Sequence, residues 1–160
     1  MQNMNQVKKI AISGIIIAVY IVVMFFTQSF AFGEFQIRVA TSLYALASIY
    51  PFLIVPLGLA NLLSNTLMGG LGWPDMIGGF VVGILTAGSC AYLRKTSIYL
   101  TALPIVFFPA VLVPIWLSCL LHVPYQILAV SIGIGQLIPG ILGFFLVKYL
   151  EQPLARIAVN

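Results

Sequence analysis

The sequence predicts an all-α membrane protein, a compact bundle of about six transmembrane helices in a single integral membrane domain, residues 1–160. Hydrophobic residues make up 62% of the chain and charged residues 6%, which leaves too little polar surface to cover a water-soluble globule. Apolar runs of near membrane-spanning length recur along the chain. Most Lys and Arg residues lie beside the ends of these runs, where positive charge indicates membrane topology rather than nucleic-acid binding.

The first expected span covers residues 10–30, close to the ~20 residues that cross a hydrocarbon core. Its apolar run is longer than the core of a signal peptide, so we expect a retained helix. Ala11, Gly14 and Ala18 form one stripe of this helix, and Gly14 and Ala18 have small-x-x-x-small spacing. Such a stripe allows another helix to approach closely. Spacing alone leaves two alternatives open: packing within this chain, or docking to a different protein.

A short polar segment follows at residues 32–38, with the sequence Phe-Gly-Glu-Phe-Gln-Ile-Arg. Phe35 and Ile37 alternate with the polar residues Glu34, Gln36 and Arg38. This alternation predicts a short extended piece over the bundle. We expect it to form an extracellular lid loop or a rim.

The region 39–67 allows either one kinked span with a long loop or two shorter spans broken at Pro51, because proline disfavours helix in the preceding residue. Charge distribution favours two spans, which gives five further spans at residues 39–50, 52–68, 76–93, 98–121 and 125–150. The cations at span ends then share one side: Lys8, Lys9, Arg94, Lys95, Lys148 and Arg156. Glu34, Arg38, Asp75 and His122 share the other. By the positive-inside rule, both termini are cytoplasmic and the acidic mouth is outside.

The last two spans carry features that predict bent helices. Prolines lie inside both, at positions 104, 109, 114 and 139, and such prolines are tolerated where neighbours bind the freed carbonyls. Gln136 lies ~16 Å into the last span at the helical rise, where a buried amide either binds a ligand or bonds a neighbouring helix. Gly79 and Gly83 form a second close-packing face, which we expect to serve packing within the chain.

The chain lacks the usual residue sets of enzymes. It has one histidine, no Gly-Lys-Ser/Thr phosphate loop and no Gly-x-Ser-x-Gly elbow. We therefore expect no catalytic residue, no metal site and no cofactor in this chain. Cys90 and Cys119 are expected to be free, buried thiols.

The remaining polar residues form a binding inventory. Asn61 and Asn65 lie one helical turn apart on one face, which is costly in a bilayer unless it points at a helix or a cavity. Together with Gln136 they supply amides, while Glu34 and Asp75 supply acceptors, Arg38 a planar donor and Trp73 a stacking face. A flat polar heterocycle fits this set. Two alternatives stay open: an interfacial role for Trp73, and a rim salt bridge between Glu34 and Arg38.

Four motifs carry a resemblance to a known family: FQIRV at residues 35–39, GLANL at 58–62, GGLG and DMIG at 69–72 and 75–78, and GIGQL at 133–137. With them the chain resembles, over nearly its whole length, the queuosine precursor transporter (QueT) family. These proteins are substrate-binding S components of energy-coupling factor (ECF) transporters. The resemblance implies a multi-pass protein of the bacterial plasma membrane with six spans.

The same resemblance implies a mechanism and partners. A 7-deazaguanine base would be captured from outside by the loops after spans one and three. The stripe at Ala11, Gly14 and Ala18 would dock on a shared transmembrane scaffold subunit coupled to two ATPase subunits, which use the ATP. Toppling of the S component in the membrane would carry the ligand across.

The sequence departs from the family pattern at two positions. The arginine is followed in the family by a hydroxyl residue and a glutamate, and the last span carries Gly-Glu. Here Thr41 and Gln136 stand where the acids are expected. They can form hydrogen bonds but cannot neutralise a buried ammonium group. This favours a neutral relative such as the nitrile precursor, or another vitamin-like solute. The alternatives from other classes are a membrane interaction protein that transports nothing and a passive channel.

Overall fold

The computed structural model describes residues 4–68 and 70–159, with side chains as far as residue 153. Gly69 and the side chain of Arg156 therefore lie outside the described part. The described chain contains these helices, where η denotes a 3₁₀ helix: α1 (Gln6–Ala31), η1 (Val39–Ser48), η2 (Pro51–Leu53), α2 (Ile54–Leu67), α3 (Trp73–Leu93), η3 (Ile98–Thr101), α4 (Ala102–Leu121), α5 (Tyr125–Gly135) and α6 (Leu137–Val159).

The helical membrane bundle predicted from the sequence is confirmed. Among the described residues, four stretches are long and apolar enough to cross a membrane: Gln6–Ala31, Trp73–Leu93, Ile98–Leu121 and Tyr125–Pro153. Two shorter apolar stretches, Val39–Ser48 and Pro51–Leu67, complete the six expected segments. The chain leaves η1 before Pro51, as expected from the restriction that proline places on its predecessor.

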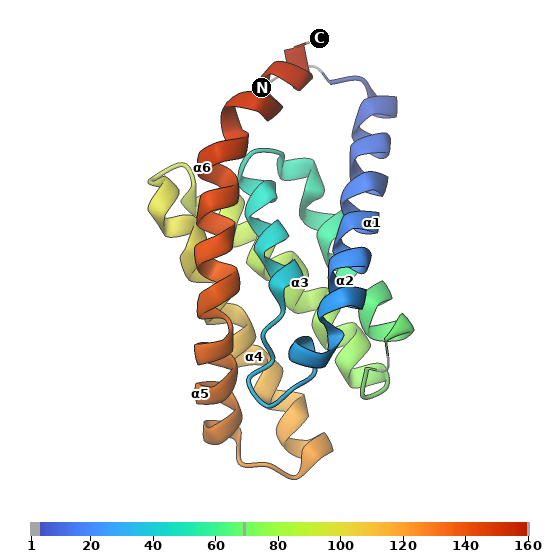
Figure 1. Ribbon diagram of the computed structural model, residues 1–160, viewed down its shortest axis with the longest axis vertical. Coiled ribbons are helices and arrows are strands. Elements are labelled where there is room, and N and C mark those ends of the chain that lie inside the picture. The colour runs from blue at the N-terminus through green and yellow to red at the C-terminus, as the bar shows by residue number, and fades with distance from the viewer. Residues whose placement is uncertain (1–3, 69, 160) are drawn as a thin grey trace.

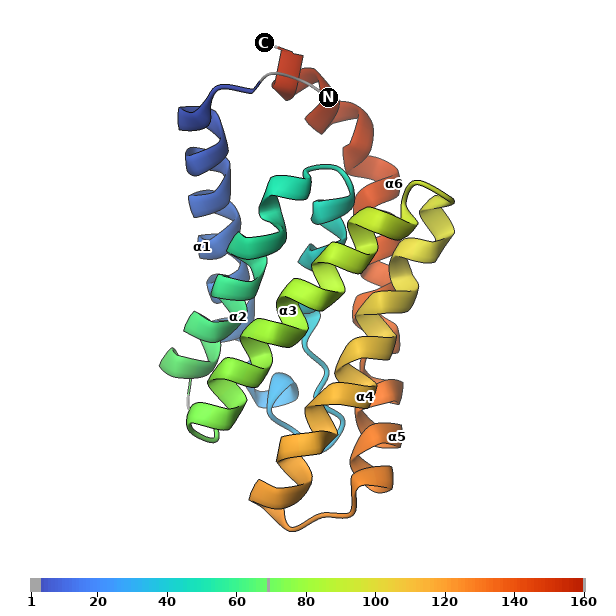
Figure 2. The ribbon, with the colours of Figure 1, turned by 180° about the vertical axis from the view of Figure 1, so that it is seen from behind.

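The 3₁₀ helix η1 lies in the middle of the bundle, in contact with α1, α3 and α6 (Figure 1). Seen from behind, α2 and α3 lie side by side, and α3 also contacts α4 (Figure 2). All residues of η1 from Ala40 to Ala47 are buried. A 3₁₀ helix rises ~2.0 Å per residue, so this ten-residue element covers ~20 Å of the core. The sequence predicted a span here but not its 3₁₀ form.

Glycines bring α2 and α3 into close contact, as predicted for Gly79 and Gly83. A Cβ added at Gly83 would lie 3.0 Å from the Cα of Gly58 on α2. A Cβ at Gly58 would lie 2.7 Å from the side chain of Ile84. This close approach allows polar side chains of α2 to reach across to α3.

The last span is broken between α5 and α6. Pro139 has no backbone N–H and its ring disfavours a helical carbonyl four residues earlier, at Gly135, where α5 ends. A Cβ added at Gly135 would lie 1.8 Å from the carbonyl oxygen of Phe35. The segment 32–38 therefore packs directly on the break, and only glycine allows this approach.

The expectation that residues 32–38 form an extended piece was wrong. Residues 32–35 form turns and a bend, and Gln36 has a φ of 45°. The backbone bonds locally: the N–H of Gln36 donates to Gly33 (3.0 Å) and that of Ile37 to Phe30 (3.0 Å). The alternation of polar and apolar residues here reflects a loop with one side on the bundle, since the chain must reverse between α1 and η1.

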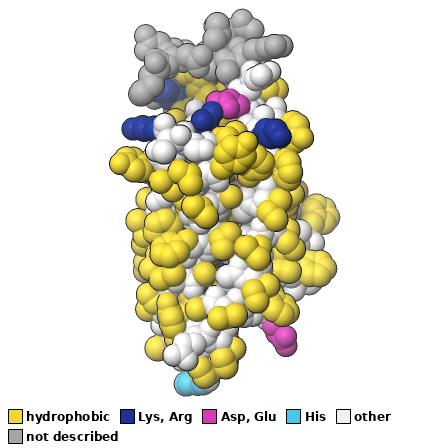
Figure 3. All heavy atoms as spheres, turned by 90° about the vertical axis from the view of Figure 1, so that its left-hand side faces the viewer, with side chains coloured by type: hydrophobic (Ala, Val, Ile, Leu, Met, Phe, Trp, Pro, Cys, Tyr) yellow, Lys and Arg dark blue, Asp and Glu magenta, His cyan; other side chains and the backbone are white. Residues whose placement is uncertain are grey.

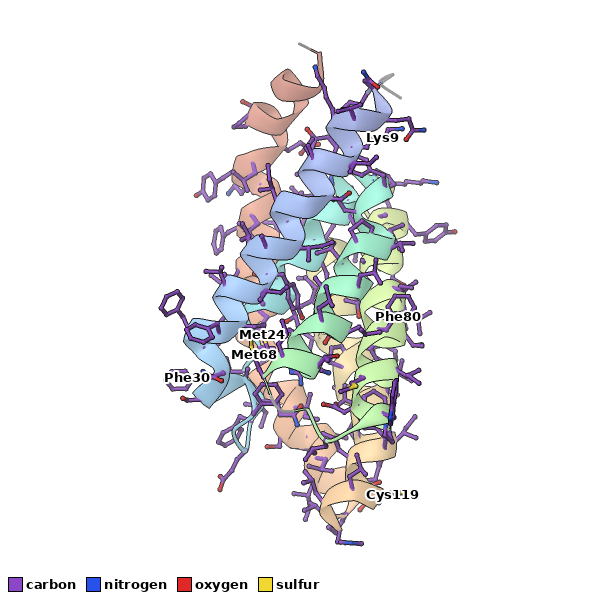
Figure 4. All side chains as sticks on the ribbon, turned by 90° about the vertical axis from the view of Figure 1, so that its right-hand side faces the viewer. Lys9, Met24, Phe30, Met68, Phe80 and Cys119 are labelled. Carbon is purple, nitrogen blue, oxygen red and sulfur yellow. The ribbon has the colours of Figure 1, made fainter. Side chains whose placement is uncertain are left out.

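Charges separate toward the two ends of the bundle. Figure 3 shows Lys and Arg side chains near one end, histidine at the other and an apolar surface between them. Lys9 lies toward the first end and Cys119 toward the opposite one (Figure 4). Helix α1 begins and α6 ends at the basic end (Figure 1).

Cys119 is exposed, contrary to expectation, whereas Cys90 is buried; both are free.

The small-residue stripe of α1 faces outward. Ala11, Gly14 and Ala18 are all exposed, and a Cβ added at Gly14 would meet nothing within 4 Å. Of the two alternatives for this stripe, packing against other described residues of the chain does not occur.

Candidate ligand-binding site

Arg38, the residue before η1, is the centre of a buried polar cluster. Its side chain is 8% exposed. Nη1 donates hydrogen bonds to Oδ1 of Asn65 (3.1 Å) and Oδ1 of Asn61 (3.3 Å). The spacing of the two asparagines on α2 does place both amides on one face, as predicted. That face points at Arg38.

The opposite ends of both amides are also occupied. Asn61 Nδ2 donates to the hydroxyl of Tyr44 (2.7 Å), and Asn65 Nδ2 donates to the carbonyl of Asp75 (3.0 Å). Gly79 on α3 makes room for them, because a Cβ there would lie 2.7 Å from Asn65 Nδ2 and 2.9 Å from Asn61 Oδ1. With their hydrogen bonds directed at protein groups, the asparagines hold Arg38 in place.

The rest of the Arg38 guanidinium is left for other contacts. Its Nε is buried and has no hydrogen-bond partner among the described residues. The ring of Phe32 covers the guanidinium, with Cζ 5.1 Å from the ring centroid. The ion pair recorded in the described part of the chain joins Arg94 to Glu151. The alternative salt bridge between Glu34 and Arg38 is therefore not formed.

Asp75 lies in the first turn of α3 and is 4% exposed. Its Oδ1 accepts a hydrogen bond from the indole Nε1 of Trp116 (3.1 Å), and Oδ2 a longer one from the backbone N–H of Leu71 (3.4 Å). The N-terminus of a helix also favours a negative charge. Gly78 lets the indole approach, since a Cβ there would lie 2.7 Å from the Trp116 ring. Together, α3 and α4 fix the carboxylate.

Thr41 and Gln136 form a second polar connection. The Thr41 hydroxyl donates to Gln136 Oε1 (2.8 Å), and Gln136 Nε2 donates to the carbonyl of Gln36 (2.9 Å). The Ser131 hydroxyl donates to the carbonyl of Glu34 (2.7 Å). These bonds tie η1, the α5–α6 region and the segment 32–38 together.

The cluster borders two neighbouring cavities. The larger has a volume of about 500 Å³, within the range of small-molecule sites, and the smaller about 20 Å³, room for roughly one water. Gln36, Arg38 and Asp75 line both. The larger is otherwise lined by Phe32, Gly33, Glu34, Leu71, Leu117, Leu121, Val123, Ile127, Leu128 and Ser131. Within the described residues no group of three or more His, Cys, Asp or Glu side chains could hold a metal ion.

The structure brings most of the predicted site residues together. Arg38, Asn61, Asn65 and Asp75 form one hydrogen-bonded cluster, and Thr41 and Gln136 lie beside it at the small cavity. Glu34 is exposed on the rim of the large cavity. Trp73 stands apart: it is 76% exposed and lines neither cavity.

Sequence reasoning missed three aromatic residues, Phe32, Tyr44 and Trp116. Tyr44 follows Thr41 by one turn of the 3₁₀ helix, a spacing that shows its significance only once that helix type is known. Trp116 lies in a uniformly apolar span and gave no signal. Phe32 lies in the polar segment 32–38, but nothing in its spacing points to Arg38.

The fold and the cluster define a helical membrane protein with a cavity and buried charges near one end. A comparison with family models matches residues 10–152 to the QueT transporter family. The chain therefore belongs to this family, and it is a transporter protein by membership. No curated protein and no solved structure matches the chain.

Proposed function

We propose that this chain is the substrate-binding S component of an ECF-type importer and captures a queuosine precursor, a 7-deazaguanine base, from outside the cell. The observation that carries the proposal is the cavity of about 500 Å³ with Arg38 and Asp75 on its inner wall, in a member of the QueT transporter family. The enclosed polar groups suit a flat heterocycle with both donors and acceptors.

The distribution of charged side chains supports an orientation of the chain in the membrane with the cavity outside. Leu121 and Val123 line the cavity and flank His122 in the sequence, and the histidine lies at the end opposite to the Lys and Arg side chains seen in Figure 3. By the positive-inside rule this end faces outward and both termini face the cytoplasm of a bacterial cell. The segment 32–38 covers one side of the cavity and acts as the lid, held by Ser131 and Gln136.

The energy for uptake comes from partner ATPases, and the α1 stripe is the docking surface for the scaffold subunit. Ala11, Gly14 and Ala18 form an exposed, shallow strip on which a partner helix can approach closely.

Calorimetric titration of the detergent-purified chain tests ligand capture. We expect one-to-one binding of a 7-deazaguanine base, with the nitrile favoured over the aminomethyl base, because Thr41 and Gln136 bond each other and offer no acid. Binding of a different vitamin would keep the architecture but overturn the substrate. No binding across the panel would overturn the proposal.

Docking is tested separately with Gly14→Leu. We expect it to abolish uptake in cells that contain the partner subunits while ligand affinity in detergent stays unchanged. The matched control is Gly88→Leu, because a Cβ at Gly88 also meets nothing within 4 Å but lies on α3. Equal loss of uptake in both variants would contradict a specific docking role for α1.

A further inference from the structure

Two buried residues of opposite charge line the same cavities without pairing. Arg38 is 8% exposed and Asp75 4%, and both border the large and the small cavity. Neither takes part in an ion pair within the described part of the chain. A buried charge is costly unless it is paired and hydrogen-bonded, so this arrangement calls for a third group that contacts both.

Arg38 offers a donor of fixed direction. Its Nη1 is held by the two asparagines and Phe32 covers its face, so the guanidinium is oriented before a ligand arrives. The buried Nε, without a partner in the described residues, remains to be satisfied. Because a guanidinium donates hydrogen bonds and accepts none, its partner must be an acceptor such as a carbonyl oxygen.

Asp75 offers the complementary acceptor. A carboxylate has about four lone-pair positions, and here Trp116 and the N–H of Leu71 occupy one on each oxygen. The remaining positions accept N–H donors from a ligand. Like Arg38, the carboxylate is oriented in advance by groups of the protein.

We propose that Arg38 and Asp75 together recognise a lactam edge, that is, a ring carbonyl next to ring and exocyclic N–H donors. The carbonyl binds Arg38 and the adjacent N–H groups bind Asp75. The two charges balance on the inner wall, so the ligand is neutral at this edge. The proposal rests on the proposed function and deepens it, because it states which atoms of the base select it.

We expect Asp75→Asn to lower the affinity for 7-deazaguanine and also to change which base binds more tightly. The amide keeps an oxygen for Trp116, and in place of Oδ2 it has a donor, which gives up the longer bond from the N–H of Leu71. A base with a second carbonyl in place of the exocyclic amine, 7-deazaxanthine, then matches the site better than 7-deazaguanine. A wrongly paired buried donor or acceptor lowers affinity roughly 10- to 100-fold.

The experiment is calorimetric titration of the full chain in detergent with both bases. We expect the wild type to prefer 7-deazaguanine and Asp75→Asn to prefer 7-deazaxanthine. Glu151→Gln is the matched control: it also exchanges a carboxylate for an amide, but at the Arg94 ion pair outside both cavities, and it keeps the wild-type preference. Unchanged preference in Asp75→Asn, with binding intact, would overturn the lactam assignment.

A second measurement needs no variant. In 2,6-diamino-7-deazapurine an amine replaces the carbonyl that faces Arg38 and the adjacent ring nitrogen loses its proton, so donor meets donor at Arg38 and acceptor meets acceptor at Asp75. We expect the wild type to bind it roughly 10- to 100-fold more weakly than 7-deazaguanine. Equal affinity would overturn the assignment of the carbonyl to Arg38. If wild type and Glu151→Gln bind none of these bases, the proposed function itself fails.

Discussion

Two pairs of opposite charges in this protein differ in almost every respect. Arg94 and Glu151 meet near the basic end of the bundle, with side chains 29% and 44% exposed, and form an ion pair. Arg38 and Asp75 are buried at the cavities, with 8% and 4% exposure, and neither forms an ion pair with a described residue. Neutral amides, an indole and backbone groups hold them in place of a counterion.

The difference separates charges that set topology from charges that serve a ligand. An ion pair at a surface contributes only about 0–1 kcal/mol, and the position of its members follows from the ends of the spans. A buried charge without a counterion costs several kcal/mol. In a membrane protein, a buried charge that lines a cavity without a counterion therefore indicates a functional role.

Arg38→Met is expected to give the largest effect on binding. Removing one member of a buried charged contact lowers ligand affinity at least about 30-fold. The thermal stability of the empty protein stays equal or rises, because losing an unpaired buried charge offsets the two unsatisfied asparagine oxygens. Calorimetry and thermal unfolding in detergent measure the two quantities.

Arg94→Met is the counterpart at the other pair. It should leave affinity unchanged and alter the free energy of unfolding by about 0–1 kcal/mol. The comparison breaks if Arg38→Met lowers the melting temperature sharply while the remaining folded protein binds as tightly as wild type, since Arg38 would then be structural.

Gly135→Ala is expected to have a smaller effect, through the lid rather than the charges. The new Cβ would lie 1.8 Å from the Phe35 carbonyl, so the segment that ends in Arg38 must shift. Such overpacking costs about 1–3 kcal/mol, and we expect affinity to fall with stability. The control Gly133→Ala adds a Cβ at an ordinary 3.5 Å from Ala110 and should change neither quantity appreciably.

Much of the site could be predicted because polar residues are rare in an apolar chain. Polar residues near or within spans were predicted as binding residues: Asn61, Asn65, Arg38, Asp75 and Gln136. The helical period also placed the two asparagines on one face. In a membrane the cost of an unsatisfied polar group makes this inference strong.

The sequence could not predict which groups the polar side chains would contact. The sequence predicted both amides as binding residues but not their partners within the chain. Both accept from Arg38, Gly79 leaves room for them against α3, and Asn61 donates to Tyr44. That outcome depends on contacts between helices distant in sequence. The lid was mistaken for an extended piece for a related reason: alternation cannot distinguish a strand from a loop that packs one side on a broken helix.

The two tryptophans give the smallest and sharpest test. Trp73 was predicted as a stacking face, but its ring is 76% exposed and lines neither cavity. Trp73→Leu should therefore keep affinity within about twofold, as exposed substitutions usually do. Trp116→Phe removes the indole donor to Asp75 Oδ1 and should weaken binding about tenfold. Calorimetry on both decides which tryptophan serves the site: the reverse order would place Trp73 against the ligand, and would mean that the segment before α3 closes over the cavity when a base binds.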